Sequence, residues 1–238
     1  MKRILITGAT SGIGKALALH AAKNNYNVIA CGRNQDALDA LAQQANITSL
    51  RFDVTNEQDA LKALKDIHVD YAVLNAGTCE YVDVDAFEPK MFRRVFEPNF
   101  FGVVNCVNGL LPNLRPGNKL IIVDSMSRLL PFTRTQAYGA SKAALHYFTK
   151  SLDVDLHDKG IHVQAVSPGF VETPLTDKNE FEMPMKITAE EAASAMLKGI
   201  ESSKGTVYFP RMFGLLLRFM HKLPESLKKK LSLSMREK

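Results

Sequence analysis

The sequence contains few residues of the kinds that build disulfide-stapled or metal-held domains. Its three cysteines, Cys31, Cys79 and Cys106, share no short spacing, and their odd number argues against a disulfide framework. The six histidines do not cluster, so we expect no metal site. Because unpaired cysteines are typical of a reducing compartment, we expect the protein to be cytoplasmic.

Long hydrophobic runs are also missing. The opening residues, MKRILITGAT, carry two positive charges and then an apolar run of only three residues, which is too short for a secretory leader. No later stretch approaches the ~20 apolar residues that a membrane-spanning helix needs. We therefore expect neither a cleaved leader nor a membrane-spanning segment.

Acidic residues are scarce at the C-terminal end. The chain has a net charge of +5, yet residues 211–238 hold eight Lys or Arg against two acids, a net charge of +6. Residues 1–210 are therefore close to neutral, and the basic character predicts no nucleic-acid binding by the fold. A chain of 238 residues, 46% of them hydrophobic, fits one α/β domain. We expect that domain over residues 1–210 and a basic amphipathic tail over 211–238.

Short apolar segments of strand character alternate with longer segments of helical period. The expected strands cover residues 3–7, 27–31, 48–54, 71–75, 119–124, 161–167 and 206–209. Their nearly continuous apolar character is typical of a parallel sheet covered by helices on both faces. Strand–helix alternation of this kind predicts a Rossmann-type, doubly wound parallel α/β sheet of about seven strands.

A glycine-rich turn joins the first expected strand to the first helical segment. Glycines permit a tight turn and a close approach of the backbone to a pyrophosphate. The helix that follows would point unpaired N–H groups and its positive dipole end at that anion. The turn therefore predicts a dinucleotide-binding site, held by Gly8, Thr10, Ser11, Gly12, Ile13 and Gly14.

The spacing of these glycines is G-x-x-x-G-x-G, which differs from the commoner G-x-G-x-x-G fingerprint. It resembles the T-G-x-x-x-G-x-G signature of the short-chain dehydrogenase/reductase family. Residues 75–77 resemble the family's N-N-A-G motif, although Leu74 replaces the first asparagine. Residues 168–173 resemble its P-G-x-V-x-T motif. The resemblance covers roughly residues 3–209, with each motif in the expected order.

The resemblance implies further cofactor contacts at the ends of the later strands. Asp53 and Val54 would hold the adenine ring, and the Val171 backbone and the Thr173 hydroxyl would contact the nicotinamide carboxamide. The cofactor residues implied in this way are Asp53, Val54, Asn75, Ala76, Gly77, Tyr138, Lys142, Pro168, Gly169, Val171 and Thr173.

The end of the second expected strand predicts which nicotinamide cofactor is bound. NAD-binding folds place an acid there to accept hydrogen bonds from the ribose hydroxyls. This chain has Arg33 and Asn34 instead, with no acid before Asp36. An arginine offers a fork of donors that suits a 2′-phosphate, which favours NADP(H). Alternatively, Arg33 is a solvated turn residue.

A tyrosine and a lysine provide the expected catalytic pair. Tyr138 and Lys142 are four residues apart in a helical pattern that runs to about Lys159, so they share one helix face. A nearby ammonium stabilises a phenolate and lowers its pKa, which suits a general acid/base. By resemblance, Ser125 orients the substrate oxygen and Asn99 holds a water in a proton relay from Lys142. Ser127 is the less favoured candidate for the serine role.

Three function classes fit these motifs. The first is an oxidoreductase that transfers a hydride between NADP(H) and a carbonyl or alcohol substrate. The second is a non-catalytic NADP(H) sensor or scaffold, although such proteins usually lose the tyrosine or the lysine. The third is a nucleotide-sugar epimerase or dehydratase, which would need a different glycine spacing and a larger C-terminal region.

The substrate side and the tail are less specific. Phe181, Met183 and Met185 could form an adaptable apolar lid, and Met126, Phe132 and Phe170 could line the pocket or simply pack surface helices. We expect the substrate to be a small-molecule carbonyl or alcohol compound that is apolar and medium-sized. We also expect a homo-oligomer, a dimer or a tetramer, with a homodimer as the default. In the tail, an i, i+4 stripe consists of Leu215, Phe219, Leu223, Leu227 and Leu231. It could dock on the fold or a second subunit, or lie on an anionic membrane.

Overall fold

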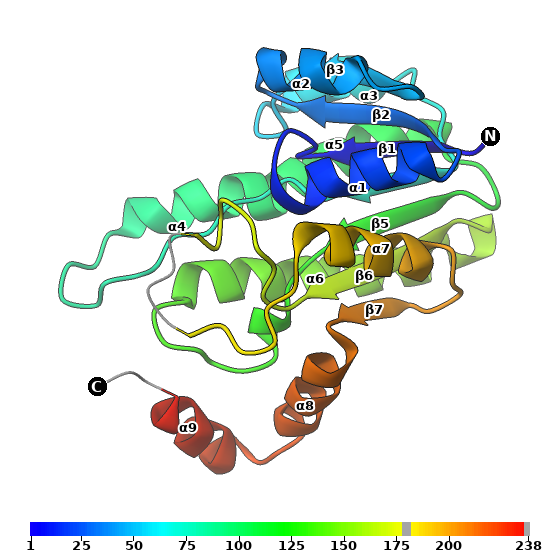
Figure 1. Ribbon diagram of the computed structural model, residues 1–238. Coiled ribbons are helices and arrows are strands. Elements are labelled where there is room, and N and C mark those ends of the chain that lie inside the picture. The colour runs from blue at the N-terminus through cyan, green and yellow to red at the C-terminus, as the bar shows by residue number, and fades with distance from the viewer. Residues whose placement is uncertain (178–181, 236–238) are drawn as a thin grey trace.

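The computed structural model describes residues 1–177 and 182–235. Its strands form one parallel sheet in the order β3-β2-β1-β4-β5-β6-β7 (Figure 1). The strands are β1 (Arg3–Thr7), β2 (Asn27–Gly32), β3 (Ile47–Arg51), β4 (Tyr71–Leu74), β5 (Lys119–Val123), β6 (His162–Pro168) and β7 (Thr206–Phe209). This confirms the predicted doubly wound sheet.

The boundary of the third strand was predicted wrongly. β3 ends at Arg51, three residues before the expected end, because its partner β2 ends at Gly32 and pairs with Arg51 in the last register position. Phe52 donates one further backbone hydrogen bond to the Gly32 carbonyl. Asp53 therefore lies in the loop after β3, where its side chain is available to a site at the sheet edge.

Helices cover both faces of the sheet (Figure 1). They are α1 (Gly12–Lys23), α2 (Gln35–Ala42), α3 (Glu57–Leu64), α4 (Pro89–Phe96), α5 (Gly102–Leu110), α6 (Gln136–Leu156), α7 (Ala189–Ile200), α8 (Arg211–His221) and α9 (Glu225–Ser234). α1, α2 and α7 pack on one face, whereas α3, α5 and α6 pack on the other. The long helix expected around Tyr138 is α6, which continues as a short 3-10 turn and stops at Gly160 in the left-handed region.

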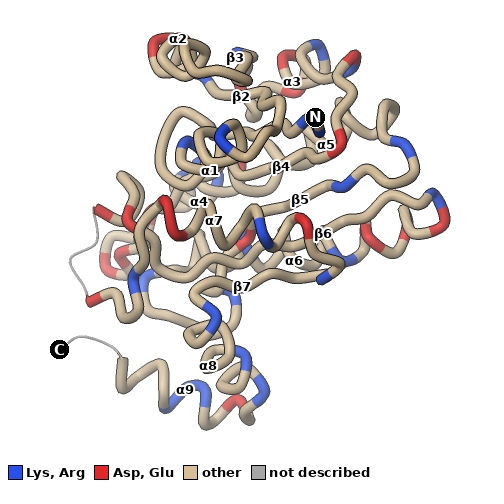
Figure 2. Tube along the Cα trace, turned by 45° about the vertical axis from the view of Figure 1, so that its right-hand side comes forward, with Lys and Arg blue, Asp and Glu red and all other residues tan. Residues whose placement is uncertain are grey.

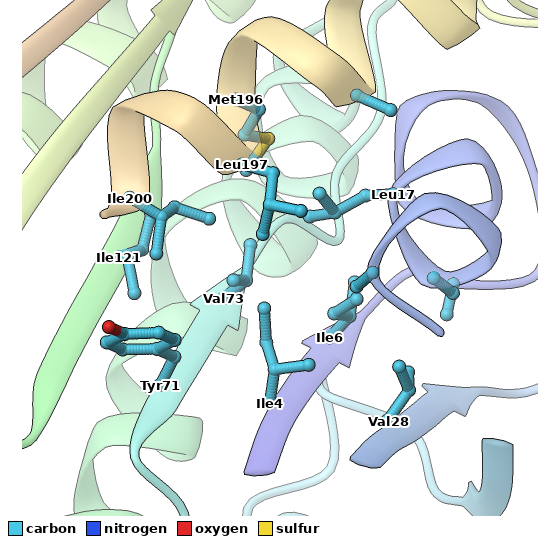
Figure 3. Close-up of a cluster of buried hydrophobic side chains, with 14 of the residues drawn as sticks. Ile4, Ile6, Leu17, Val28, Tyr71, Val73, Ile121, Met196, Leu197 and Ile200 are labelled. Carbon is cyan, nitrogen blue, oxygen red and sulfur yellow. The ribbon is translucent and has the colours of Figure 1, made fainter. Parts of the chain in front are cut away.

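The alternation of side chains along β1 builds both cores. Ile4 and Ile6 point toward α1 and α7, and Leu5 points to the opposite face, each of them fully buried. Figure 3 shows Ile4 and Ile6 beside Leu17 of α1 and Leu197 of α7. Burying such side chains stabilises the fold by about 1.5–3 kcal/mol each. This packing makes the centre of the sheet a rigid base for the strand ends.

The strand order reverses between β1 and β4. β1 pairs with β2 on one side and with β4 on the other. In open α/β sheets, ligands bind outside the carboxyl ends of the strands at such a switch point, because the loops diverge there. We therefore expect a ligand to bind at the loops after β1, β4, β5 and β6.

The C-terminal helices leave most of the predicted stripe exposed, with only Leu223 and Leu231 of its residues half-buried. α8 is held by Phe213 and Leu217, which pack against Met126 and Leu129. Within the predicted stripe, by contrast, the side chains of Leu215, Phe219 and Leu227 are exposed. A regular spacing defines a helix face, but only the surface available on the fold decides which face is buried. No helix in the described ranges has the length and apolar character needed to cross a membrane.

Candidate active site

The turn after β1 brings its backbone against the loop after β4. Gly8 and Gly12 have positive φ values of 67° and 50°, which L side chains rarely adopt. A Cβ on Gly8 would lie 2.9 Å from the Ala76 Cα, and a Cβ on Gly14 would lie 2.2 Å from the Gly8 carbonyl oxygen. The turn therefore requires these glycines, and it leaves backbone rather than side chains facing the sheet edge.

The N-terminus of α1 has the character of an anion site. Ser11 occupies the N-cap but makes no side-chain hydrogen bond to the first turn, and that turn contains no acid. Asn34 caps α2, Asn56 caps α3 and a capping box begins α7, whereas α4, α6, α8 and α9 also lack a side-chain cap. What distinguishes α1 is that the glycine turn directly precedes its uncapped first turn. The first N–H groups of α1 thus keep their capacity to bind a phosphate, in line with the helix dipole.

A threonine that the sequence analysis did not identify fixes this arrangement. The Thr7 hydroxyl accepts hydrogen bonds from the backbone N–H groups of Asn75 and Ala76, at 3.0 and 3.1 Å. The Asn75 amide in turn donates to the Thr7 carbonyl at 3.1 Å. Asn75 therefore ties β4 to β1 through its backbone N–H and its amide nitrogen. The only sequence signal for Thr7 was its place before Gly8.

The predicted cofactor residues surround a cleft of about 990 Å³ along the carboxyl edge of the sheet. The expected residues that line it are Gly8, Thr10, Ser11, Gly12, Ile13, Arg33, Asn34, Asp53, Val54, Asn75, Ala76, Gly77 and Thr173. Gly14 lies behind the turn and shapes it instead. The sequence analysis missed the outer wall formed by Glu80, Arg94 and Glu97. These residues come from segments without a recognisable motif, so only the tertiary structure identifies them.

Arg33 lies at one end of the cleft. Its guanidinium is 3.4 Å from the Asp53 carboxylate, and its side chain is 74% exposed. Burial alone would raise the pKa of Asp53, but hydrogen bonds from Thr55 and the charge of Arg33 outweigh it and lower the pKa. Arg33 thus presents donors to solvent at the cleft mouth. The Asn34 side chain, by contrast, accepts a hydrogen bond from the Ala37 N–H as the α2 cap.

A smaller cavity adjoins the cleft and contains the predicted catalytic side chains. Its volume is about 110 Å³. The predicted residues that line it are Ser125, Tyr138, Lys142, Pro168, Gly169, Val171 and Thr173. Ile13, Asn75 and Gly77 line both spaces, so the two adjoin. Ser125 comes from the end of β5, and Tyr138 and Lys142 come from α6.

Lys142 is deeply buried between α6 and β5. Its ammonium donates to the Val123 carbonyl at 2.9 Å. Removal from water lowers the pKa of Lys142 to about 8, although the nearby Asp124 charge opposes the decrease. A Cβ on Gly77 would lie 2.8 Å from the Asn99 Oδ1 and 3.5 Å from the Lys142 Nζ. The absence of a side chain at Gly77 therefore leaves room beside Lys142.

The expected decrease in the pKa of Tyr138 is not found among the protein groups alone. Burial raises the pKa of Tyr138 above its ordinary value, and a hydrogen bond with Ser125 offsets only part of this increase. The Lys142 ammonium lies 5.9 Å from the centre of the Tyr138 ring and is hydrogen-bonded to Val123 instead. Ser125, rather than Lys142, is thus the protein group that favours the phenolate here.

Asn99 lies in a five-residue π-helix, Glu97–Phe101, that links α4 to α5. It is fully buried and does not line the cavity. Its Oδ1 accepts from the Thr78 N–H at 2.7 Å, while its amide nitrogen donates to the Thr78 carbonyl and to the Ser141 hydroxyl. Asn99 therefore holds the loop after β4 against α6.

A buried carboxylate lies directly before Ser125. Asp124 accepts hydrogen bonds from the Arg128 Nε at 2.9 Å, from the His146 Nδ1 at 2.6 Å and from the Ser167 hydroxyl. This network joins β5, α6 and β6 behind the cavity. The Ser125 hydroxyl itself accepts from the Ser127 N–H at 3.1 Å. His146 and Ser167 lie 22 and 43 residues after Asp124 in the sequence, which is why the sequence did not predict the network.

The residues expected at the substrate end have different positions. Met126, Phe132 and Phe170 do not line either space but form a cluster with Phe213 and Leu217 of α8. Of the expected lid residues, Phe181 lies outside the described residues, and Met185 is exposed. Leu175 and Thr176 line the small cavity instead.

Comparison with known proteins places the chain in a family. The model of the short chain dehydrogenase family matches residues 2–183. An uncharacterized oxidoreductase of Myxococcus xanthus is 33% identical over 94% of this chain and 93% of its own. A 3beta-hydroxysteroid dehydrogenase of Mediterraneibacter gnavus is 35% identical over 81% of this chain and 74% of its own. A short chain dehydrogenase from Burkholderia cenocepacia, solved with NADP, superimposes with a TM-score of 0.86 at 24% identity over 97% of both chains. The protein belongs to the short-chain dehydrogenase/reductase family of oxidoreductases, as its motifs indicated.

Proposed function

We propose that this protein is an NADP(H)-dependent reductase or dehydrogenase of carbonyl and alcohol compounds. The proposal rests on one observation. Ser125, Tyr138 and Lys142 line the same small cavity, and this cavity adjoins the long cleft. The uncapped helix α1 and the glycine turn fit the pyrophosphate of a dinucleotide in that cleft.

The proposed roles follow from the positions of the side chains. When bound, the reduced nicotinamide supplies the hydride for the carbonyl carbon. Ser125 orients the carbonyl oxygen, and Tyr138 donates a proton to that oxygen, so that an alcohol forms. Lys142 holds the cofactor ribose and adds positive charge beside the phenol. Asn99 supports a proton relay by fixing the backbone of Thr78. In the oxidative direction Tyr138 accepts the proton instead.

Positive charge at Arg33 supports NADP(H) over NAD(H). The guanidinium is exposed at the cleft mouth, where it could bind a 2′-phosphate with two donors. The Burkholderia cenocepacia structure was solved with NADP. Because that protein has the same fold and was solved with NADP, its likeness to this chain supports the proposal of NADP(H) as the cofactor.

Replacing Arg33 should change the choice of cofactor. Arg33→Ala should weaken NADPH binding by about tenfold to a hundredfold, since a charge-assisted hydrogen bond contributes about 1.5–3 kcal/mol. NADH binding should change little, because NADH lacks the phosphate. Fluorescence titration of both cofactors measures the ratio, with Arg93→Ala as the matched control, because Arg93 is exposed and does not line the cleft. Equal losses of affinity for NADPH and NADH would show that Arg33 is a solvated surface residue that does not bind the 2′-phosphate.

The protonation of Lys142 should make cofactor binding depend on pH. Burial lowers the pKa of Lys142 to about 8, so its charge is present below that pH and is lost as the pH rises through it. The phosphates of NADPH favour the charged form, so NADPH affinity should fall by up to about tenfold between pH 7 and pH 9.5. Calorimetry in buffers of different ionisation enthalpy should also detect proton uptake near pH 8. A flat profile for the intact protein would contradict the role of Lys142, whereas Lys142→Gln is expected to be flat.

The substrate class can be identified by a screen of carbonyl compounds. The matched Mediterraneibacter protein is named for a 3β-hydroxysteroid, which is an apolar alcohol. A screen of NADPH oxidation with aldehydes, ketones, quinones, steroids and β-keto acyl compounds tests the proposal directly. Turnover of any carbonyl class supports it. Tight NADPH binding without turnover of any class would favour the alternative, a non-catalytic sensor or scaffold.

A further inference from the structure

Helix α8 has two apolar faces, and the fold uses only one of them. Phe213, Leu217 and Met220 pack against the segment that follows Ser125. A second set, Met212, Leu215, Leu216 and Phe219, follows the spacing i, i+3, i+4 and i+7, so these side chains share another face. They are exposed by 69, 57, 47 and 67%. A helix that serves only to cover its own fold needs no second apolar face.

Exposed apolar side chains are concentrated in this part of the chain. Of the fifteen large hydrophobic residues that are exposed in the described ranges, seven lie between Met212 and Met235. The other three in α9 and just after it are Leu227, Leu233 and Met235. Such clustering is typical of an interaction surface rather than of scattered surface residues.

Positive charge surrounds the apolar face. Arg211 begins α8 and Lys222 directly follows it, and both are exposed, as are Lys229 and Lys230 on α9. Figure 2 shows Lys and Arg along α8 and α9, which stand apart from the body of the sheet. The net charge is +6 over residues 211–238, although the rest of the chain is nearly neutral. We call α8 and α9 together the C-terminal basic surface.

The charge decides between two partners for this surface. A symmetric dimer through the C-terminal basic surface would bring together two patches of net charge +4, each with five Lys or Arg and one Glu in α8 and α9, and like charges in an interface cost several kcal/mol. An anionic bilayer offers the complementary charge and an apolar layer for the exposed side chains. Helices that cannot span a bilayer can still lie in its interface.

We infer that the C-terminal basic surface binds the face of a membrane that contains anionic phospholipid. Met212, Leu215, Leu216 and Phe219 enter the interface, and the basic side chains contact the lipid headgroups. The opposite face of α8 stays packed on Met126 and Leu129, next to Ser125. The bilayer would therefore lie beside the segment that leads out of the candidate active site. This inference does not depend on the proposed reaction.

The test uses the full chain and vesicles of two compositions. Co-sedimentation should be strong with an equal mixture of phosphatidylglycerol and phosphatidylcholine and weak with phosphatidylcholine alone. It should weaken as salt is raised, because salt screens the attraction. Leu215→Ser with Phe219→Ser should lower the partition coefficient at least about thirtyfold, through lost apolar burial. Lys229→Gln with Lys230→Gln should lower it about fivefold for each charge.

Matched controls come from residues outside the C-terminal basic surface. Val84→Ser removes an exposed apolar side chain, and Lys62→Gln with Lys65→Gln removes two exposed charges. All three control substitutions should leave vesicle binding unchanged, and circular dichroism with NADPH titration should show that every variant is folded. Equal binding to both vesicle types, or none, would overturn the inference. So would sedimentation velocity showing a dimer that Leu215→Ser with Phe219→Ser dissociates, because the face would then join two copies of the chain.

Discussion

Tyr138→Phe should abolish turnover while leaving the fold and the NADPH site intact. The substitution removes only the phenol oxygen, and the ring can keep its packing against Val82, Val95 and Ala137. General acid/base catalysis by a positioned side chain contributes about 10²–10⁴-fold, so the loss should lie in this range or above it. The readout is NADPH oxidation with whichever carbonyl compound the screen identifies.

The control for this prediction lies on the same helix. Tyr147 is 79% exposed on α6, so Tyr147→Phe makes the same chemical change away from the cavity and should leave the rate unchanged. NADPH affinity of Tyr138→Phe should stay within a few fold of the original. Retained turnover would remove Tyr138 from the proton transfer. A parallel loss of NADPH binding would instead mean that the phenol supports the cofactor site.

Gly14→Ala should damage both the stability of the domain and the cofactor cradle. The added Cβ would lie 2.2 Å from the Gly8 carbonyl oxygen and 2.7 Å from the Asn75 Nδ2, and neither group can move freely. Alanine favours a helix over glycine by about 1 kcal/mol, yet overpacking costs about 1–3 kcal/mol and more where the backbone must shift. We expect a lower melting temperature and at least a tenfold loss of NADPH affinity, since the turn must open.

Gly205→Ala is the matched control for this steric argument. A Cβ there approaches only the Lys150 Nζ, at 3.5 Å, so it meets no backbone. This variant should keep NADPH binding and gain a few tenths of a kcal/mol, because alanine has a smaller entropy loss on folding. Thermal melts with and without NADPH separate the two effects. If Gly14→Ala is as stable as Gly205→Ala and still gains stability from NADPH, the turn is less tightly packed than described here.

Local pattern predicted the sheet and most of the candidate site. The buried strands are nearly continuous in apolar residues, so their number and approximate ends could be predicted, and the four-residue spacing of Tyr138 and Lys142 placed both on one helix face. The end of β3 could not be predicted, because it depends on where β2 stops. Likewise, the role of Thr7 depends on the N–H groups of Asn75 and Ala76, which lie far along the chain.

The sequence by itself determined the fold, the glycine turn and the family, because each depends on residues that are neighbours in the chain. Tertiary structure decided what each group can still do. It tied the Asn75 amide nitrogen to the Thr7 carbonyl, surrounded Asp124 with Arg128 and His146, and raised the pKa of Tyr138 through burial. It also decided that α8 buries Phe213 and Leu217 rather than Leu215 and Phe219. Burial and hydrogen-bond partners depend on surfaces that meet only after folding. The spacing of residues along the chain therefore does not predict them.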